Sequence, residues 1–276
     1  MKRQWLRRSG LLLLALLLAL PLYAALIAAS HAPGDLLGRL PWLPGNRLLH
    51  NLRTVLGAGL PGSPSVLRML GNSLVMALGI ALGKLTLATL SAYAVVYFRF
   101  PLRHTAFVLI LSSLMLPLEV RFYPTFQVSA GLHLLNSYGV LIVPLIASAT
   151  ATFLLRQFFA SMPPSLLDAA RMDGAGPMQF FLHSALPLAR TPLAALFVLE
   201  FVYGWNQYLW PLLTTTDARY ATVVMGMQGL INAGTSFALP RWDLVMTTAL
   251  LALLPPLLVL LLAQRWFIRG LTDIEK

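Results

Sequence analysis

Two ionisable side chains, Lys84 and Glu200, stand inside long apolar stretches, where a charge is costly and marks a candidate functional residue. Lys84 has two interpretations: its side chain reaches toward a polar surface or pairs with a helix carbonyl, or it lines a translocation path. For Glu200 we expect a basic partner, in this chain or in another subunit. The pairing of these two residues stays open at this point.

A third charged candidate, Arg121, lies near the end of an apolar stretch together with Glu119. Arginine presents a planar fork of donors that matches phosphate oxygens. If the substrate is an anion that carries phosphate, Arg121 and Lys84 are therefore candidate contacts. Glu119 and Arg121 also have the option of pairing locally at the membrane interface.

Amides and aromatic rings alternate in the segment from Trp205 to Trp210, which includes Asn206 and Gln207. One interpretation is hydrogen bonding between helices combined with an aromatic belt at the membrane interface. The other is a cavity in which Asn206 and Gln207 contact a polar solute.

Several classes of chemistry find no support. The chain has no cysteine, and its five histidines are scattered without the spacing of metal ligands. No nucleophile–base pair points to an intramembrane enzyme. The string Gly79–Leu85 is one residue short of a phosphate-binding loop and has Leu85 where a hydroxyl is needed. We expect no catalytic residue, metal or cofactor, and any ATP hydrolysis must come from a separate subunit. Gly79 and Gly83 instead predict close helix packing.

The composition indicates whether these residues lie in water or in a membrane. Of the 276 residues 58% are hydrophobic and 11% charged, whereas a soluble domain carries about 25% charged residues. The net charge of +11 comes from residues that separate long apolar runs, not from a clustered basic face typical of nucleic-acid binders. The sequence predicts an all-α polytopic membrane protein.

Apolar runs of about 20 residues predict six transmembrane helices. They lie at residues 10–30, 72–97, 104–123, 138–158, 192–213 and 244–267. The first run follows Lys2, Arg3, Arg7 and Arg8, so it is either a retained span or a cleaved signal peptide. With the N-terminus inside, the cytoplasmic side carries 12 Lys and Arg residues and the opposite side 7, which favours two cytoplasmic termini.

Two loops interrupt this single transmembrane domain of residues 1–276. Residues 32–71 are rich in Pro and Gly and predict an irregular periplasmic loop. Residues 157–191 form a cytoplasmic loop that is longer than the other predicted cytoplasmic loops. There Pro163 and Pro164 end the preceding helix, and Ser165 is expected to cap a short helix at Leu166–Met172.

The second half of the 157–191 loop predicts another short helix. Gly174 and Gly176 allow a tight turn, Pro177 suits a helix start, and Pro187 is expected to end the helix Met178–Ala185. Such a pair is either an amphipathic hairpin on the membrane surface or an element that docks into a groove of a partner.

The residues of this loop resemble a known family. The run Asp168–Ala175, followed by Leu186–Leu188, is similar to the EAA loop of ABC-importer permeases, whose coupling helices sit in clefts of the cytoplasmic ATPase. The resemblance implies a coupling role for Asp168, Ala169, Ala170, Asp173, Gly174 and Pro187. Asp168 stands where the family usually has Glu, which keeps the charge and shortens the reach.

Further segments narrow the resemblance. Tyr203–Leu212 and Phe267–Thr272 resemble the second permease of carbohydrate-type importers. Tyr97–Arg103, Met115–Arg121 and Ser148–Leu154 are similar to permeases of sn-glycerol-3-phosphate importers. The likeness covers Leu70–Lys276, with a permease core at residues 70–267, and reaches the N-terminal quarter only in hydropathy.

The resemblance implies a type I ABC importer permease fold in the cell inner membrane. Its partners would be a second homologous permease, two cytoplasmic ATPase subunits and a periplasmic substrate-binding protein. The C-terminal tail, Arg269–Lys276, would reach the ATPase interface. The implied cargo is sn-glycerol 3-phosphate, with glycerophosphodiesters as further candidates and a maltose-type oligosaccharide as the alternative. A secondary transporter built from inverted repeats is disfavoured, because the sequence shows no repeats.

Overall fold

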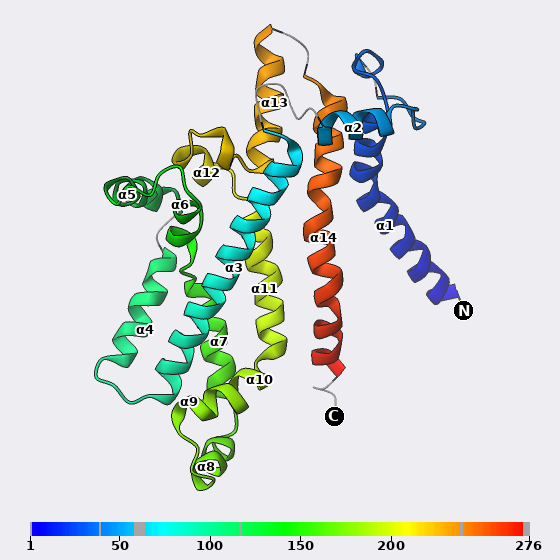
Figure 1. The fold of residues 1–276 in the computed structure, drawn as a ribbon. Helices are drawn as coiled ribbons and strands as arrows, with labels where there is room; N and C mark the ends of the chain where they lie inside the picture. Colours follow the sequence, from blue (N-terminus) through cyan, green and yellow to red (C-terminus); the bar gives the residue numbers. More distant parts are fainter. Residues whose placement is uncertain (1, 39, 58–63, 116–117, 238–239, 273–276) are drawn as a thin grey trace. The chain divides into compact units, whose positions relative to one another are not determined.

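A computed structural model describes residues 2–38, 40–57, 64–115, 118–237 and 240–272; of residues 2–6, 114, 118–119, 233–237 and 265–272 it describes only the backbone. Every regular element in these ranges is helical, which confirms the predicted all-α class (Figure 1). In chain order they are α1 (Lys2–Ala29), η1 (Pro33–Leu36), α2 (Leu48–Gly57), α3 (Val66–Tyr97), α4 (Arg103–Ser112), η2 (Ser113–Met115), α5 (Leu118–Gly131), α6 (Tyr138–Ile142), η3 (Val143–Leu145), α7 (Ala149–Ser161), α8 (Pro164–Met172), α9 (Pro177–Phe180), the π-helix η4 (Phe181–Ala185), α10 (Leu186–Leu188), α11 (Arg190–Trp205), α12 (Leu209–Thr214), η5 (Ala218–Tyr220), α13 (Val223–Phe237) and α14 (Trp242–Thr272).

The chain forms two compact units. Unit 1 comprises Met1–Asn72 and Ala221–Leu254, and unit 2 comprises Ser73–Tyr220 and Pro255–Lys276. Unit 2 contains the charged candidates and the 157–191 loop, and is therefore the unit that positions the site.

Five of the six predicted spans have a counterpart among the described helices. Three single helices are long and apolar enough to cross a membrane, namely Arg7–Ala29, Val66–Tyr97 and Trp242–Gln264. Two bent pairs reach that length together: Tyr138–Leu145 with Ala149–Ser161, bent by 47°, and Pro177–Leu188 with Arg190–Trp205, bent by 72°.

The segment 104–123 differs from its expected single helix. Helix α4 ends at Ser112, the short η2 follows, and a new helix, α5, begins at Leu118. Pro117 stands immediately before α5. The break brings Arg121 onto a separate helix.

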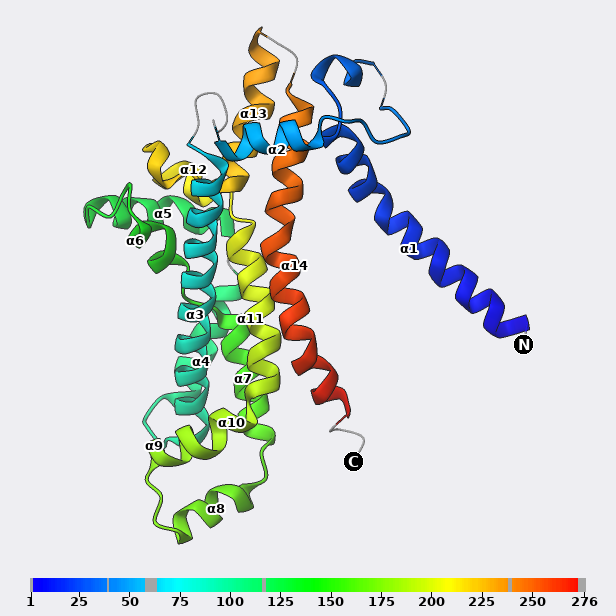
Figure 2. The same cartoon turned by 45° about the vertical axis from the view of Figure 1, so that its right-hand side comes forward.

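Small residues allow close approach in unit 2, as the sequence predicts. A Cβ atom on Gly79 would lie 2.6 Å from Ile142 Cδ1, and one on Gly83 would lie 2.5 Å from Ile146 Cγ2. A Cβ on Gly204 of α11 would lie 2.9 Å from the Cα of Ala77. Figures 1 and 2 show α3 running beside α11 along much of its length. Gly204 thus lets the two helices that carry Lys84 and Glu200 approach closely, whereas Gly79 and Gly83 allow close contact with the segment at Ile142 and Ile146.

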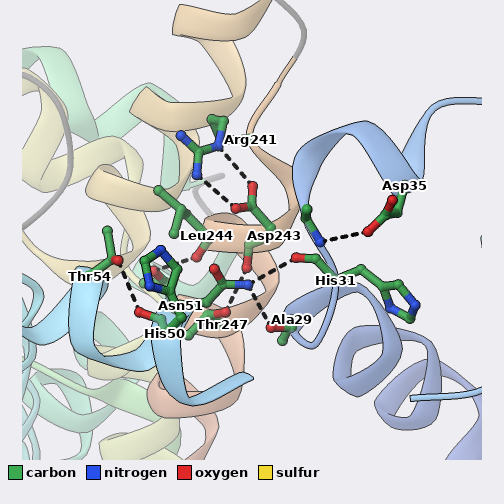
Figure 3. Close-up of polar contacts among 12 residues, drawn as sticks. Ala29, His31, Asp35, His50, Asn51, Thr54, Arg241, Asp243, Leu244 and Thr247 are labelled. Carbon is green, nitrogen blue, oxygen red and sulfur yellow. Dashed lines mark hydrogen bonds and ion pairs between the residues drawn. The ribbon is translucent and has the colours of Figure 1, made fainter. Parts of the chain in front are cut away.

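Unit 1 is fastened by polar contacts at its loop end (Figure 3). The Asn51 amide of α2 donates to the carbonyl oxygens of Ala29, at 2.9 Å, and His31, at 3.1 Å. At the start of α14, Arg241 donates to both carboxylate oxygens of the fully buried Asp243, at 3.0 and 2.8 Å. The 32–71 segment is therefore more regular than predicted, because it contains α2 and closes the end of α1.

Candidate functional site

Lys84 and Glu200 form an ion pair inside unit 2. Lys84 Nζ of α3 lies 2.8 Å from Glu200 Oε2 of α11, and the two side chains are only 7% and 11% exposed. The second carboxylate oxygen of Glu200 accepts a 2.8 Å hydrogen bond from Ser148 Oγ. A buried ion pair is stable only when its remaining polar atoms are satisfied, and the Ser148 hydroxyl does this for Glu200.

Two more contacts fix the pair in place. Lys84 Nζ lies 3.5 Å from the ring centroid of Tyr203, which is close enough for a cation–π interaction. Ser148 also accepts a 3.2 Å hydrogen bond from the backbone N–H of Ala151, and so caps the start of α7. The pair therefore joins α3, α7 and α11 at one point.

A cavity of about 320 Å³ opens beside this ion pair. Its wall combines the two cations with hydroxyl groups and aromatic rings. The lining residues are Lys84, Ser113, Arg121, Phe122, Thr125, Pro144, Leu145, Ala147, Ser148, Ala149, Thr150, Tyr203 and Trp210. A concave site with an apolar wall and a few convergent polar groups is the usual form of a small-ligand site.

Arg121 gives the cavity its excess charge. Its side chain is exposed, and none of the carboxylates whose side chains are described pairs with it. The expected local partner, Glu119, has a side chain outside the described residues. Because the Lys84 charge is balanced by Glu200, Arg121 is the cation among the described lining residues for which no described carboxylate is a partner.

The break in the first bent pair lies in the cavity wall. Between Leu145 and Ala149 the chain leaves helical geometry, and Ala147 and Ser148 of this break line the cavity. Irregular backbone at membrane depth is tolerated where it is buried in protein or lines a polar cavity. The first turn of α7, with Ala149 and Thr150, also faces this space, and a helix N-terminus favours anions.

The amide candidates lie elsewhere. Helix α11 ends at Trp205, so Asn206 is the residue after the helix and its side chain is exposed. Gln207 donates a 3.2 Å hydrogen bond to the Tyr203 carbonyl oxygen. Neither residue lines the cavity. Both residues lie between α11, which ends at Trp205, and α12, which begins at Leu209, and not inside one continuous helix.

The sequence reasoning missed three polar or aromatic residues of the site. Tyr203 and Trp210 were assigned no individual role, and Trp210 Nε1 donates a 2.8 Å bond to the Val140 carbonyl oxygen. Ser148 was not singled out either. One signal was present: Ser148 stands in a run of small and polar residues that interrupts an apolar stretch, which indicates a helix start.

The loop 157–191, here called the hairpin, has the predicted two helical arms. Helix α8 is close to the expected Leu166–Met172, although it begins at Pro164 and not after a Ser165 cap. Gly174 has a φ of +75°, and the Ala175 N–H donates to the Ala170 carbonyl oxygen at 2.9 Å. These are the features of a Schellman helix end, which glycine satisfies without strain.

The second arm corrects one prediction. Pro187 lies inside α10 and does not end the helix; the bend comes after Ala189. The preceding residues, Phe181–Ala185, form a π-helix. A π turn changes the carbonyl that faces the proline ring, so the chain accommodates Pro187 without breaking.

The proposed coupling residues form an accessible tip. Asp168, Ala169, Asp173 and Gly174 are exposed, Ala170 and Pro187 are half-buried, and no residue of α8 is buried. Asp168 pairs with Arg171 at 3.5 Å on the surface, a contact that contributes little to stability. The tail residues Asp273–Lys276 lie outside the described residues, so the expected position of the tail stays a prediction.

A family model covers most of the chain. Residues 84–273 match the family described as "Binding-protein-dependent transport system inner membrane component". The matched range includes Lys84, Glu200, the cavity and the hairpin.

Close relatives extend the match. A protein of Yersinia pestis bv. Antiqua (strain Antiqua), named sn-glycerol-3-phosphate transport system permease protein UgpE, is 52% identical over 95% of this chain and 93% of its own length. Proteins of the same name from Pectobacterium atrosepticum and Salmonella typhi are 52% and 51% identical, each over 93% of this chain and 91% of their own.

Solved structures support the fold. A chain of a bacterial ABC transporter involved in the import of the acidic polysaccharide alginate matches with a TM-score of 0.78, at 19% identity, over 96% of this chain and 97% of its own. A chain of an alginate ABC transporter in complex with a pentasaccharide-bound periplasmic protein matches with a TM-score of 0.62, at 16% identity, over 95% and 93%.

The family model and the relatives both indicate a membrane component of a transport system, and the solved structures share the fold of the chain. The chain therefore belongs to the family of binding-protein-dependent transport system inner membrane components, as a multi-pass permease of the inner membrane and not an enzyme.

Proposed function

We propose that this chain is the transmembrane permease subunit of an ATP-driven importer that carries sn-glycerol 3-phosphate, and glycerophosphodiesters, across the inner membrane. The observation that carries the substrate class is the cavity, whose described lining residues carry the charge of Arg121 in addition to the Lys84 charge that Glu200 balances. The relatives named for sn-glycerol-3-phosphate transport share about half of the sequence over nearly the whole chain. A cationic wall favours this cargo over a neutral maltose-type sugar.

The six-span topology with both termini in the cytoplasm is part of the proposal. Three spans coincide with single helices and one with the bent pair Tyr138–Leu145 and Ala149–Ser161. A fifth uses α11, Arg190–Trp205, because the arm Pro177–Leu188 that is bent against it belongs to the hairpin. The remaining one would use α4 and η2, which are shorter. An even number of spans puts both termini on one side, and the distribution of Lys and Arg supports the cytoplasmic side.

In this proposal the hairpin is cytoplasmic and docks on one of two ATPase subunits, while a second, homologous permease completes the pathway. A periplasmic binding protein delivers the cargo. ATP binding and hydrolysis shift the complex between inward- and outward-facing states only to the extent that the ATPases bind the two states with different affinity. The exposed tip at Asp168–Gly174 supports the docking role, because no residue of α8 is buried by the rest of the described chain and the tip is accessible to a partner.

Within the cavity the charged groups take different roles. Arg121 offers two parallel N–H donors to phosphate oxygens, and the hydroxyls of Ser113, Thr125 and Thr150 extend the polar wall. Lys84 and Glu200 neutralise each other, and their ion pair joins α3 to α11 beside the cavity. Asn206 and Gln207 remain weaker candidates, reached only if the pathway extends beyond the cavity.

The assembled wild-type complex tests the substrate class. In proteoliposomes with ATP inside and the loaded binding protein outside, we expect uptake of radiolabelled sn-glycerol 3-phosphate. Unlabelled glycerophosphodiesters should compete and maltose should not, since only the former carry a phosphate. Maltose uptake without sn-glycerol 3-phosphate uptake would reverse the assignment.

Replacing Arg121 tests the phosphate contact. We expect Arg121→Gln to lower the maximal uptake rate by about tenfold or more, because a hydrogen bond to a charged group is worth about 1.5–3 kcal/mol. Arg121→Lys should recover part of the rate. Saturating binding protein keeps the delivery step constant. The control is Arg219→Gln, which removes an exposed, Asp217-paired arginine outside the cavity; equal losses in both variants would refute the role of Arg121.

The ion pair should behave as a unit. Lys84→Met or Glu200→Gln alone leaves one buried charge or donor without its partner, and we expect each to destabilise unit 2 by about 3–5 kcal/mol. The double variant should recover most of the thermal midpoint and of the uptake rate, because no charge is left uncompensated. A double variant that folds like the wild type yet does not transport would make Lys84 a direct ligand of the cargo.

The turn at Gly174 tests coupling. A side chain at φ +75° costs about 1–2 kcal/mol, and a β-branched one more, so Gly174→Val should displace the hairpin tip. We expect the complex to hydrolyse ATP with little uptake. Gly176→Ala is the matched control, because Gly176 has a φ of −71° and nothing within 4 Å of an added Cβ. Coupled uptake at the wild-type ratio in Gly174→Val would count against the lever.

A further inference from the structure

Two tyrosines at the end of α3 bond to the hairpin. Tyr93 Oη donates a 2.7 Å hydrogen bond to the carbonyl oxygen of Pro177, the first residue of α9. Tyr97 Oη lies 3.2 Å from the carbonyl oxygen of Phe159 and 3.3 Å from the sulfur of Met162. The tyrosine hydroxyl stands at the far end of the ring, so each of these hydrogen bonds joins α3 to a residue that is distant in the sequence. Pro177 is 84 residues from Tyr93, and Phe159 is 62 residues from Tyr97.

The acceptor of Tyr97 has a particular place. Phe159 lies in the last turn of α7, where carbonyl groups have no partner within an α-helix. The backbone contact of its carbonyl, from Met162 N, is long at 3.4 Å. Tyr97 therefore supplies a side-chain cap at the point where α7 passes into the hairpin.

Aromatic rings surround both hydroxyls. The Tyr93 ring centroid lies 4.7 Å from that of Phe181 and 4.9 Å from that of Tyr97, and the Tyr97 centroid lies 5.3 Å from that of Phe180. Tyr93, Phe159, Phe180 and Phe181 are buried in one cluster. The rings supply packing and the hydroxyls supply direction, since a hydrogen bond fixes one geometry and ring packing tolerates several.

These contacts lie between the hairpin and the cavity. The hairpin is continuous in the chain with α7 and α11, whereas α3 contacts it only through non-covalent interactions. Along α3, Lys84 is nine residues from Tyr93, or about 13 Å of helix. Beside the ring contacts, the hydrogen bonds described between α3 and residues 157–191 are those of Tyr93 and Tyr97.

We infer that Tyr93 and Tyr97 are positioning residues whose hydroxyls make α3 and the hairpin move as one body. A displacement of the hairpin tip is then passed to α3 directly, and with it to the cavity wall at Lys84, in addition to its route along α11. The inference rests on the proposed coupling function of the hairpin, and it assigns to α3 a driven motion that the sequence of the loop alone does not indicate.

Removing the hydroxyls alone tests this. Tyr93→Phe and Tyr97→Phe keep the rings, and the double variant should lower the number of substrate molecules imported per ATP by about tenfold, since each hydrogen bond contributes a factor of about 2–13 to an equilibrium. Basal ATP hydrolysis and the amount of assembled complex should stay within about twofold. A purely structural role would lower both rates together and leave their ratio unchanged, which would overturn the inference.

Tyr23→Phe is the matched control. Tyr23 Oη donates to the carbonyl oxygen of Trp42 in unit 1, so the same kind of bond is lost away from the hairpin. The transport ratio should then stay at the wild-type value. A fall equal to that of the double variant would show that any such bond matters and would refute the specific role of Tyr93 and Tyr97.

A covalent link gives a second measurement. The chain has no cysteine, so Tyr97→Cys with Met162→Cys creates the only thiol pair in this subunit. We expect the pair to be uncoupled when free and to regain at least half of the wild-type ratio when joined by a short thiol cross-linker. Loss of uptake on cross-linking would mean that α3 slides against the hairpin, contrary to the inference. If the wild-type complex shows no ATP-driven uptake at all, the proposed function fails instead.

Discussion

The structure of unit 2 depends on the neutralisation of one buried lysine. Lys84 and Glu200 are 116 residues apart, and their ion pair, completed by Ser148, holds three helices at the same depth. Neither charge would be stable in an apolar bundle without the other. The close approach of α3 and α11, which Gly204 permits, is what brings the two side chains within reach. The cavity wall, the packing of α3 against α11 and the charge balance thus all depend on this ion pair. A substitution that disturbs one of them is expected to disturb the other two.

The cavity and the hairpin use broken helices for different purposes. At Ile146–Ser148 the break lies at the cavity wall, where Ala147 and Ser148 are lining residues, and irregular backbone is tolerated at such a place. At Ala189 the bend of 72° separates the second arm of the hairpin from α11. Both breaks occur beside residues that are poor in the middle of a helix, a small polar run in the first case and Pro187 in the second.

Patterns local in the sequence were predictable. Three spans follow from apolar length, and the turn at Gly174 follows from glycine at a helix end, because both depend on neighbouring residues only. The pairing of Lys84 with Glu200 was not, since nothing along the chain encodes a contact between distant helices. The end of α11 at Trp205 was not predictable either, because the apolar stretch continues past Trp205 although the helix does not. Pro187 was misjudged because the π turn that accommodates it has no sequence rule of comparable strength.

The single excess cation of the cavity has an electrical consequence. A phosphate ester entering a bacterial cytoplasm moves against a potential that is negative inside, at about 2.3 kcal/mol per unit charge for each 100 mV. In the proposed site Arg121 is fixed in the cavity wall, so it offsets one unit of the cargo's charge only while the cargo is bound there, and the whole charge of the cargo, one unit for a diester and up to two for a monoester, still crosses the field. The energy needed for each transport cycle would then depend on the charge of the cargo, with membrane voltage acting on the monoester more strongly than on the diester.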